Sequence, residues 1–410
     1  VINPISAGDT AWVLISSALV MLMTPGLAFF YGGMVRRKNV LGVLMQCMGT
    51  LALVSVLWVL YGYSLAFGKG SPFIGGLEWL GLNGVGQEAY ADYSATIPHL
   101  AFMIFQAMFA VITPALIIGA FAERVKFSAF IAFTVLWLTL VYAPICHMVW
   151  AVGGWVRGMG ALDFAGGTVV HINAGVAGLV TALFVGKRIG IDKPSLHNIP
   201  FVVLGGALLW FGWFGFNAGS ALAANGLAAS AFVVTNTAAA MAALTWATLE
   251  WIFSGKPTMF GTITGAVAGL VAITPASGFV DVGASLWIGA LVSVFCYFVV
   301  SVVKPKLGYD DSLDAFGVHG IGGFWGAIAT GIFATKAVNS AGADGLLAGN
   351  AAQLWIQFKA AGITVVYCAI VTWIICFIVD KTIGMRVKPE HESMGLDLTQ
   401  HHERAYTMIE

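Results

Sequence analysis

Long apolar stretches alternate along the chain with short clusters of charged residues. A helix that crosses a membrane needs about 20 mainly apolar residues, and a helix satisfies its own backbone hydrogen bonds in lipid. Each uncharged stretch therefore predicts one membrane-spanning helix. These stretches lie between Asp9 and Arg36, Lys38 and Lys69, Asp92 and Glu123, Lys126 and Arg157, Asp163 and Lys187, Lys256 and Asp281, Asp281 and Lys304, Asp314 and Lys336, and Lys359 and Asp380.

The interval from Lys193 to Glu250 is long enough for two such helices, with a turn near Asn225 and Gly226. The pattern therefore predicts an all-α polytopic membrane protein with eleven spans. An odd number of spans places the two termini on opposite sides of the membrane. We expect one eleven-helix bundle over residues 1–388, followed by a tail over residues 389–410.

Basic residues fall mainly in the loops on one side of the predicted bundle. The other side holds only Lys69, Arg157 and Lys336. Loops rich in Lys and Arg usually face the cytoplasm, so we expect the N-terminus outside and the C-terminus inside. The rich set is Arg36, Arg37, Lys38, Arg124, Lys126, Lys187, Arg188, Lys193, Lys256, Lys304, Lys306, Lys381, Arg386, Lys388 and Arg404.

The composition excludes several classes of protein. Of the 410 residues, 59% are hydrophobic and 9% are charged, whereas soluble domains carry about 25% charged residues. An ordinary soluble enzyme and a disordered chain are therefore excluded. The net charge is zero and there is no basic block, which excludes a nucleic-acid binder. The five cysteines form no CxxC pair and read as packing residues, and we expect neither a metal nor a cofactor.

Two segments of the chain share one pattern. The first reads DFAGGTVVHINAGVAG from Asp163, and the second reads DAFGVHGIGGFWGA from Asp314. In each, a Val-His pair is followed by glycines four and seven residues beyond the histidine. The segments fall on the fifth and tenth predicted spans, which run in opposite directions. The pattern predicts an inverted repeat of spans one to five and six to ten, and transporters commonly bind substrate at such an interface.

His171 and His319 are the histidines of this repeat. An ionisable side chain inside a membrane span is costly and suggests function by default. If the two rings face each other, they can share one proton and form hydrogen bonds along a dry pore. A structural role, metal ligation and a haem clamp are the alternatives. Metal ligation has little support, because no Cys or carboxylate triad lies nearby. Covalent haem has none, because the sequence contains no CxxCH motif.

An acidic residue precedes each histidine at the edge of the membrane. Asp163 lies eight residues before His171, and Asp314 lies five residues before His319. Such a carboxylate attracts a cation or caps a helix N-terminus. Both roles stay open for Asp163, whereas for Asp314 we expect the cap.

Aromatic residues gather towards the outer end of the predicted bundle. Each alone is typical of packing, but together they suit an aromatic cage that attracts a small cation through its π faces, with a hydroxyl to accept one N–H. The residues are Phe105 and Phe109 on the third span, Trp150 at the end of the fourth, and Trp213, Phe216 and Ser220 on the sixth.

With these motifs, the chain resembles the ammonium transporter (Amt/Mep/Rh) family, especially its bacterial Amt branch. The resemblance covers essentially the whole chain. The matching segments are PGLAFFYGGMVRRKNV from Pro25, AFAERVKFSA from Ala120, LDFAGGTVVHINAGVAGL from Leu162, GWFGFNAGS from Gly212, ITPASGFV from Ile273, DAFGVHGIGG from Asp314 and GLDLTQHHERAY from Gly395.

The resemblance implies roles for individual residues. Trp150, Ser220 and Phe109 match the family's outer ammonium-recruitment site, with Phe105 nearby and Asp163 as an acidic, largely structural neighbour. Phe109 and Phe216 match the two stacked rings that close the pore. His171 and His319 match the twin histidines, and Trp213 and Thr274 match pore-lining or supporting positions.

The resemblance also implies the activity and the partners. It implies a homotrimer in the cell inner membrane, not an enzyme, that recruits ammonium, deprotonates it and conducts ammonia, with the proton moving separately. The alternative is an ammonium sensor coupled to a cytoplasmic signalling domain. The tail from Gly395 to Tyr406 resembles the family segment that binds PII-type signal proteins.

Overall fold

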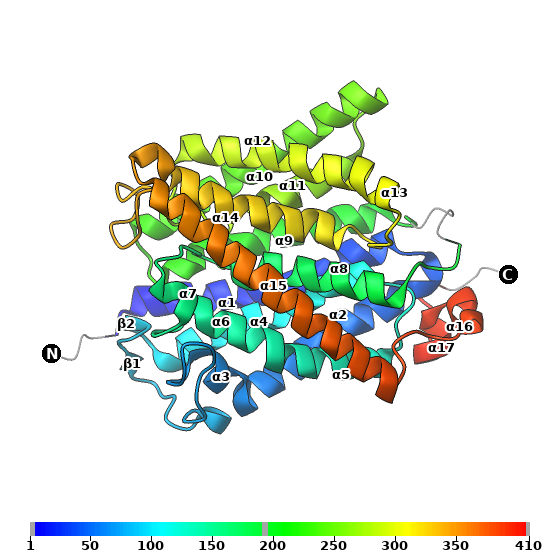
Figure 1. Cartoon of the computed structure of the whole chain (residues 1–410), viewed down its shortest axis with the longest axis horizontal. Coiled ribbons are helices and arrows are strands. Elements are labelled where there is room, and N and C mark those ends of the chain that lie inside the picture. The colour runs from blue at the N-terminus through cyan, green and yellow to red at the C-terminus, as the bar shows by residue number, and fades with distance from the viewer. Residues whose placement is uncertain (1–4, 191–195, 407–410) are drawn as a thin grey trace.

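The computed structural model describes residues 5–190 and 196–406, and helices form most of it (Figure 1). Lys193, counted above among the basic residues, lies outside the described residues. The α-helices are α1 Ala7–Met34, α2 Val40–Leu57, α3 Tyr63–Phe67, α4 His99–Phe121, α5 Phe127–Trp137, α6 Ala143–Trp150, α7 Trp155–Gly158, α8 Asn173–Val185, α9 Ile199–Ala218, α10 Gly226–Ser254, α11 Met259–Ile273, α12 Val282–Phe298, α13 Lys304–Leu307, α14 Ile321–Phe333, α15 Ala351–Thr382, α16 Pro389–Met394 and α17 Leu396–His401.

Short segments of other geometry join or interrupt these helices. Two strands, β1 Ala89–Tyr90 and β2 Ser94–Pro98, pair antiparallel. In the described residues, five π-helical segments begin or interrupt longer helical runs, a geometry that is frequent at functional sites. These are η2 Trp58–Gly62, η4 Leu138–Tyr142, η5 Gly167–Ile172, η7 Val299–Val303 and η8 Phe316–Gly320. The 3₁₀ turns are η1 Arg37–Asn39, η3 Leu80–Leu82, η6 Gly219–Ala221 and η9 Leu346–Ala348.

Ten of the predicted spans appear in the described residues as helical runs long and apolar enough to cross a membrane. The interval with two predicted spans holds α9 and α10, and the Asn225 side chain accepts hydrogen bonds from the first N–H groups of α10. The remaining predicted span corresponds to α11, which is apolar but has 15 residues. Helix α11 packs against α9, α10, α12 and α14, and residues 265–273 are all buried.

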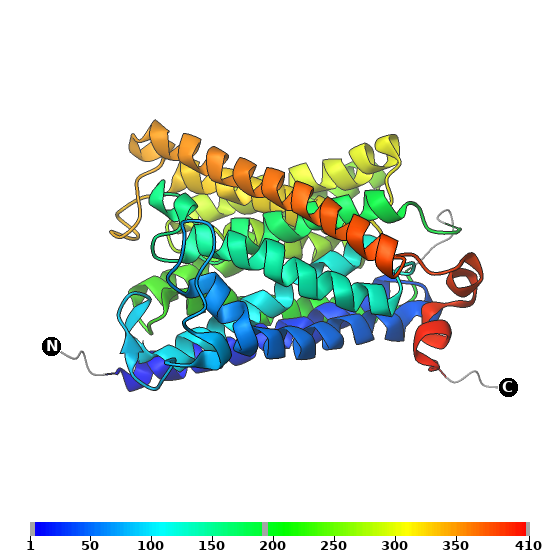
Figure 2. The ribbon, with the colours of Figure 1, turned by 60° about the horizontal axis from the view of Figure 1, so that its bottom comes forward.

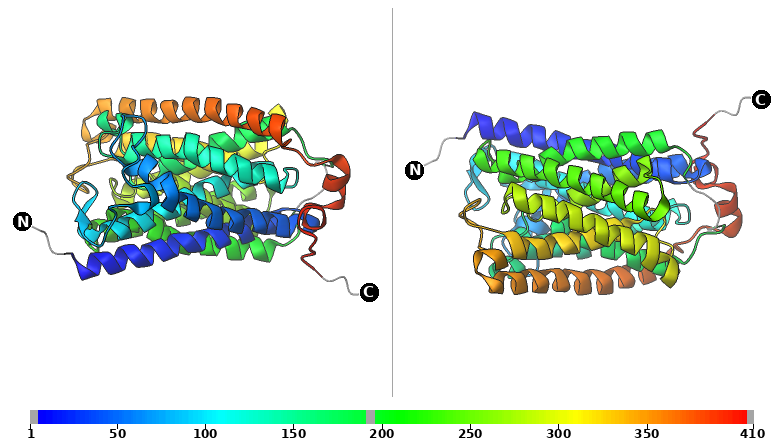
Figure 3. Two further views of the ribbon diagram at one scale, coloured as in Figure 1. Left: turned by 90° about the horizontal axis from the view of Figure 1, so that it is seen from below. Right: turned by 90° about the horizontal axis from the view of Figure 1, so that it is seen from above.

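The helices lie side by side in one bundle with two distinct ends (Figures 1 and 2). The end that carries β1 and β2, where α1 begins, is called here the hairpin end. The end that carries α16 and α17 is called the tail end. Both views in Figure 3 place the start of α1 and the red C-terminal helices at these opposite ends.

The outside of the bundle is apolar. Large hydrophobic side chains are exposed along the peripheral helices α10, α12 and α15, for example Ile252 at 68%, Trp287 at 62% and Val366 at 59%. A soluble protein rarely exposes such extended apolar surface, whereas lipid chains cover it at no cost. The centre of the bundle is formed by α4 and by the run of η5 and α8, most of whose residues are buried.

Candidate functional site

The first histidine segment, defined as residues 163–178, begins with a carboxylate cap. Asp163 Oδ1 accepts the N–H groups of Gly166 and Gly167 at 2.8 and 2.7 Å. Its Oδ2 accepts those of Thr168 and Val169 at 2.9 and 3.2 Å. Four N–H groups that a helix start would leave unpaired are thereby satisfied. The geometry of Asp163 is therefore that of a helix cap.

The second histidine segment, defined as residues 311–326, begins with an equivalent cap made by Asp311. Its carboxylate accepts the N–H groups of residues 315–317 at 3.0, 2.8 and 3.4 Å. Asp311 precedes His319 by eight residues, which is the spacing between Asp163 and His171. The two segments thus start in the same way, and Asp311 is the counterpart of Asp163.

The expectation that Asp314 caps this helix is therefore wrong. Asp314 lies three residues inside the cap, and its Oδ1 pairs with Lys304 Nζ at 2.6 Å. Spacing from the histidine could have identified Asp311, because the eight-residue interval in the first segment has an exact match in the second.

Glycines bring the two segments into contact. A Cβ on Gly175 would lie 2.2 Å from the backbone N of Gly320, and a Cβ on Gly323 would lie 2.9 Å from the Cβ of His171. Each glycine lies four residues beyond its own histidine and packs on the backbone of the other segment. The absence of side chains here is what lets the two histidines approach each other.

The two histidine rings lie in direct contact in the core. His171 Nδ1 and His319 Nδ1 are 3.3 Å apart, and the rings are tilted by 15° with centroids 5.4 Å apart. They are 1% and 4% exposed. Since one nitrogen of such a contact must donate and the other accept, one proton occupies the space between the rings. His171 Nε2, on the far side of its ring, has no hydrogen-bond partner among the described residues.

A column of aromatic rings connects the histidines to the hairpin end. His171 stacks on Trp213 at 5.3 Å and on Phe216 at 5.9 Å between ring centroids. Trp213 Nε1 donates to Thr274 Oγ1 at 2.8 Å, which fixes the indole. Phe216 in turn lies 4.4 Å from Phe109. The structure therefore places Trp213, Thr274, Phe216 and Phe109 in one series of contacts that ends at His171.

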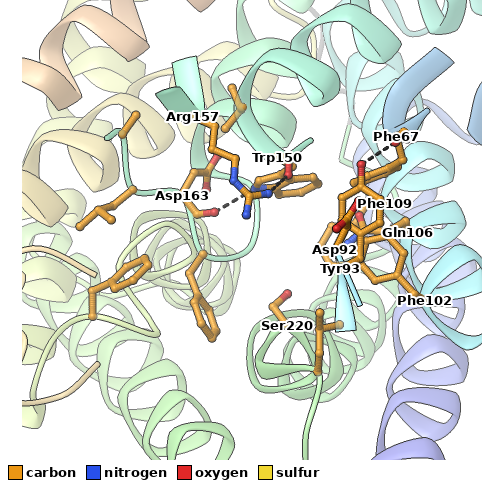
Figure 4. Close-up of a pocket in the computed structure, with 16 residues that line it drawn as sticks. Phe67, Asp92, Tyr93, Phe102, Gln106, Phe109, Trp150, Arg157, Asp163 and Ser220 are labelled. Carbon is orange, nitrogen blue, oxygen red and sulfur yellow. Dashed lines mark hydrogen bonds between the residues drawn. The ribbon is translucent and has the colours of Figure 1, made fainter. Parts of the chain in front are cut away.

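A cavity of about 310 Å³ opens at the hairpin end above these rings (Figure 4). We call it the vestibule. Trp150, Phe109, Ser220 and Asp163 all line it, so the structure brings these four predicted residues together. Phe109 meets Trp150 edge to face at 5.6 Å. Ser220 Oγ donates to the carbonyl of Phe216, which leaves its lone pairs free to accept a hydrogen bond.

The cap of the first segment also holds the wall of the vestibule. Trp150 Nε1 donates to the backbone carbonyl of Asp163 at 2.9 Å. Arg157 Nη1 donates to the carbonyl of Trp150. The orientation of the Trp150 indole is thus set by the residue that caps the histidine helix.

Phe105 is placed behind the vestibule and is not among the residues that line it. Its ring packs on Phe109 at 5.0 Å, is fully buried, and lies against Gly219. Phe105 therefore supports the position of Phe109 in this structure.

Two small cavities meet at His319 below the aromatic pair. The first, about 10 Å³, is lined by Val170, His171, Phe216 and His319. The second, also about 10 Å³, lies towards the tail end and is lined by His319, Asp314 and Tyr31, among others. Each is large enough for about one water-sized molecule. The free space beside the histidine pair is therefore small.

Sequence reasoning missed several polar residues of the vestibule. Gln106 lines it, and its Oε1 is buried without a partner in the part of the chain that the structure describes. Asp92 and Arg157 line it from loop and short-helix positions. Gln106 carried a signal, since it is the one polar residue in an apolar run from Leu100 to Val111. Asp92 and Arg157 resembled ordinary loop charges.

The fold and this site define a multi-pass α-helical membrane protein with a buried histidine pair behind an aromatic vestibule. A family model described as Ammonium Transporter Family matches residues 11–406. The chain belongs to the ammonium transporter family.

Individual relatives agree with this assignment. An ammonium transporter of Bacillus subtilis (strain 168) is 57% identical over 399 residues, covering 97% of this chain and 98% of that protein. The crystal structure of Candida albicans Mep2 has a TM-score of 0.89 at 35% identity, covering 94% of this chain and 87% of that one. A solved structure of a Sensor Amt Protein has a TM-score of 0.87 at 28% identity, covering 96% and 98%.

Proposed function

We propose that this protein recruits ammonium in the vestibule, removes one proton and conducts ammonia past His171 and His319, with the proton moving separately. The observation that carries the proposal is the histidine pair in contact directly behind the Phe109–Phe216 rings. An ammonium ion stripped of water in an apolar pore would cost of order tens of kcal/mol before relaxation. Neutral ammonia costs only its lost hydrogen bonds.

Ammonium is recruited by the aromatic rings and the hydroxyl group that line the vestibule. The π faces of Trp150 and Phe109 attract a cation, and Ser220 Oγ accepts one of its N–H groups. Asp163 contributes negative charge near the floor, although its oxygens are engaged by four N–H groups. Phe105 holds Phe109 in place.

Phe109 and Phe216 form the gate in this proposal. Their centroids are 4.4 Å apart and both rings are buried, at 1% and 0% exposure. Nothing passes between rings in van der Waals contact, so at least one must rotate for each molecule conducted. The closed gate also keeps bulk water away from His171.

In this proposal the chain crosses the membrane eleven times, and α11 is the short, buried span. Loops rich in Lys and Arg lie next to the tail end, which we assign to the cytoplasm. Spans one to five and six to ten then form an inverted repeat whose axis runs between the two histidines. Residues 1–388 form the transport domain and residues 389–410 the cytoplasmic tail.

We also propose a homotrimer in the cell inner membrane, each subunit with its own pore, and a PII-type signal protein as a partner of the tail. The tail is docked through charged groups: Glu392 pairs with Arg386 at 2.9 Å, and Asp397 accepts the N–H of Gly42 at the start of α2 at 2.8 Å. A docked tail can report the binding of a partner to the transmembrane helices.

Transport is favoured over the sensor alternative. The fold does not distinguish the two functions, because Mep2 and the Sensor Amt Protein both share it. Sequence identity does, since the Bacillus subtilis ammonium transporter is 57% identical to this chain and the sensor protein is 28% identical.

The experiment is an ammonium jump on proteoliposomes of known protein content, with current as the readout. We expect an inward current that a modest excess of potassium, a cation of similar size, does not inhibit. Absence of any ammonium-dependent current or flux would contradict transport, and competition by potassium would contradict deprotonation before conduction.

A further inference from the structure

The two histidine segments differ at the residue that lies five positions before each histidine. In the first segment it is Gly166, with φ 116°, and in the second it is Asp314, with φ 59°. Both backbones are in the left-handed region, where glycine is free and other residues are uncommon. A charged residue therefore stands where the equivalent position uses glycine, and its strained backbone is a reason to look for function.

The side chain of Asp314 reaches the inner end of the path. It lines the tail-end cavity of about 10 Å³ together with His319, Tyr31 and Val318. His319 uses Nδ1 for its contact with His171, so Nε2 is the ring nitrogen that remains for hydrogen bonds or proton transfer on the side of the tail-end cavity. Asp314 is also 16% exposed at its side chain, so the same carboxylate touches both the cavity and the solution at the tail end.

Asp314 lies in a cluster of charged groups whose close members include more carboxyl groups than basic ones. Lys304 from α13 pairs with it at 2.6 Å. Asp311 is buried beside it: burial and then the charge of Asp314 raise the pKa of Asp311 to about 6. Tyr309 and, more distantly, Tyr31 and Arg188 complete the titratable or charged groups that face this cluster. One lysine thus faces two carboxyl groups, which suits a site that accepts a proton.

We propose that Asp314 is the proton-exchange carboxylate at the inner end of the path. The proton that ammonium releases at the hairpin end turns the histidine pair into a singly charged imidazolium–imidazole pair. His319, as the imidazolium, then passes its Nε2 proton, directly or through one water, to a carboxylate oxygen of Asp314, which leaves a neutral imidazole and a neutral carboxylic acid. The acid then releases this proton to water at the tail end, or to ammonia, which departs as ammonium. The hairpin end needs no such group, because there the proton arrives on ammonium itself.

This inference rests on the proposed function and adds a residue to it. The bland alternative is that Asp314 only pairs with Lys304 to hold α13. An ion-pair role requires the pair, whereas proton exchange requires the carboxylate alone. A variant that removes both charges therefore separates the two roles, because it leaves no unpaired lysine.

The test uses the full-length protein in proteoliposomes and compares wild type with Asp314→Gly, Asp314→Glu and the double variant Asp314→Gly/Lys304→Met. Glycine is the residue of the first segment and fits the backbone at 314. Asp344→Asn removes the charge of a partly exposed loop residue at the hairpin end, whose Oδ1 accepts the N–H of Lys336, and is the charge control. Current on an ammonium jump reports the proton, and [¹⁴C]methylammonium uptake reports the conducted amine.

We expect Asp314→Gly and the double variant to lose at least about tenfold in current, a modest part of the 10²–10⁴-fold typical of a positioned acid or base. Asp314→Glu should keep current with a shifted dependence on the pH of the tail-end solution, and Asp344→Asn should match wild type. Wild-type current in the correctly folded double variant would overturn the inference. If Asp314→Gly alone fails to fold, the double variant and the pH profile of Asp314→Glu decide: an unshifted profile with wild-type current in the double variant refutes proton exchange.

The same measurements distinguish a failure of ammonium transport from a failure of the role of Asp314. If wild type itself shows no ammonium current, the proposed function fails. If wild type conducts and the variants without the carboxylate conduct equally, only the role of Asp314 fails.

Discussion

The two histidine segments share one backbone plan but have different surroundings. Each has a capping aspartate, a left-handed residue, a π-helical turn with the histidine, and a glycine that packs on the other segment. Around the first lie aromatic rings and a vestibule, and around the second lie Asp314 and Lys304. The shared backbone plan positions the two histidine rings, whereas the different neighbours give the two histidines different chemical surroundings.

The comparison also shows how the two ends are linked mechanically. In the first segment the capping residue Asp163 holds Trp150 through its carbonyl. In the second, the N–H of Leu313 donates to the carbonyl of Gly119 at the end of α4, the helix that carries Phe109. The first histidine segment is therefore hydrogen-bonded to the end of α6, and the second is hydrogen-bonded to α4.

The largest effect should come from filling the glycine contact between the segments. Gly175→Ala places a Cβ 2.2 Å from a backbone nitrogen, whereas Gly323→Ala places one 2.9 Å from its nearest atoms. Both substitutions meet backbone atoms, which cannot move aside as the end of a flexible side chain does. We expect Gly175→Ala to cost about 3 kcal/mol or more in unfolding free energy, and Gly323→Ala less, because its overlap is smaller. Thermal unfolding in detergent measures both.

Gly362→Ala is the matched control, since a Cβ there meets no atom within 4 Å. Equal melting temperatures for Gly175→Ala and Gly362→Ala would show that the segments are not held together by this contact.

The second-largest effect should come from removing the charge of the aspartate that caps each histidine segment. Asp163→Asn leaves one acceptor oxygen for four N–H groups and should cost about 3 kcal/mol. Asp311→Asn should cost about half as much, because burial and Asp314 already disfavour its charge. The pKa of Asp311 in the folded protein, about 6, lies above its unfolded value, so stability from this group falls as pH rises towards 6.

The loss in Asp311→Asn should therefore be smaller at pH 7 than at pH 5. Unfolding of the detergent-solubilised protein at both pH values checks the sign. Asp281→Asn, at the exposed cap of α12, is the control and should cost less than about 0.5 kcal/mol. A larger loss for Asp311→Asn than for Asp163→Asn would reverse the comparison between the caps.

If Phe109 and Phe216 form a gate, removing the Phe216 ring should change the flux of methylammonium. Phe216→Ala removes the ring that lies between Phe109 and His171, so methylammonium uptake should rise several-fold while other small solutes stay excluded by the narrow cavities below. Uptake and leak of uncharged solutes in proteoliposomes measure this. Unchanged uptake with unchanged selectivity would remove Phe216 from the gate.

The smallest effect is expected at the vestibule. Ser220→Ala removes one hydrogen-bond acceptor worth about 1 kcal/mol, so the ammonium concentration for half-maximal current should rise about fivefold. The maximal current should change little, because the serine lies above the gate. No change in the half-maximal concentration would take Ser220 out of the binding site.

Much of the fold followed from charge-free intervals, because the cost of burying charge in lipid is large and local. Helix α11 departs from the length rule for a physical reason. It is surrounded by four helices, so it does not need to span the lipid by itself. The π-helical turns at both histidines could not be predicted, since they depend on packing between distant segments.

The candidate site was predictable where a residue type is costly in a membrane, as for His171 and His319. The site was less predictable where the role of a residue depends on the direction in which its side chain points. Asp314 and Asp311 are three residues apart, and only the structure shows which carboxylate faces the helix start and which faces Lys304. Phe105 and Phe109 share a helix face, yet only Phe109 lines the vestibule.

The most direct measurement is the ammonium-jump current of the double variant His171→Ala/His319→Ala in proteoliposomes of defined protein content. Among the described residues, His319 lines both small cavities and its ring contacts that of His171, so the double substitution removes the titratable groups that join them. The account predicts that coupled charge movement is abolished in a protein that still folds and assembles as wild type does. Wild-type current in that variant, with unchanged selectivity against potassium, would contradict the proton relay.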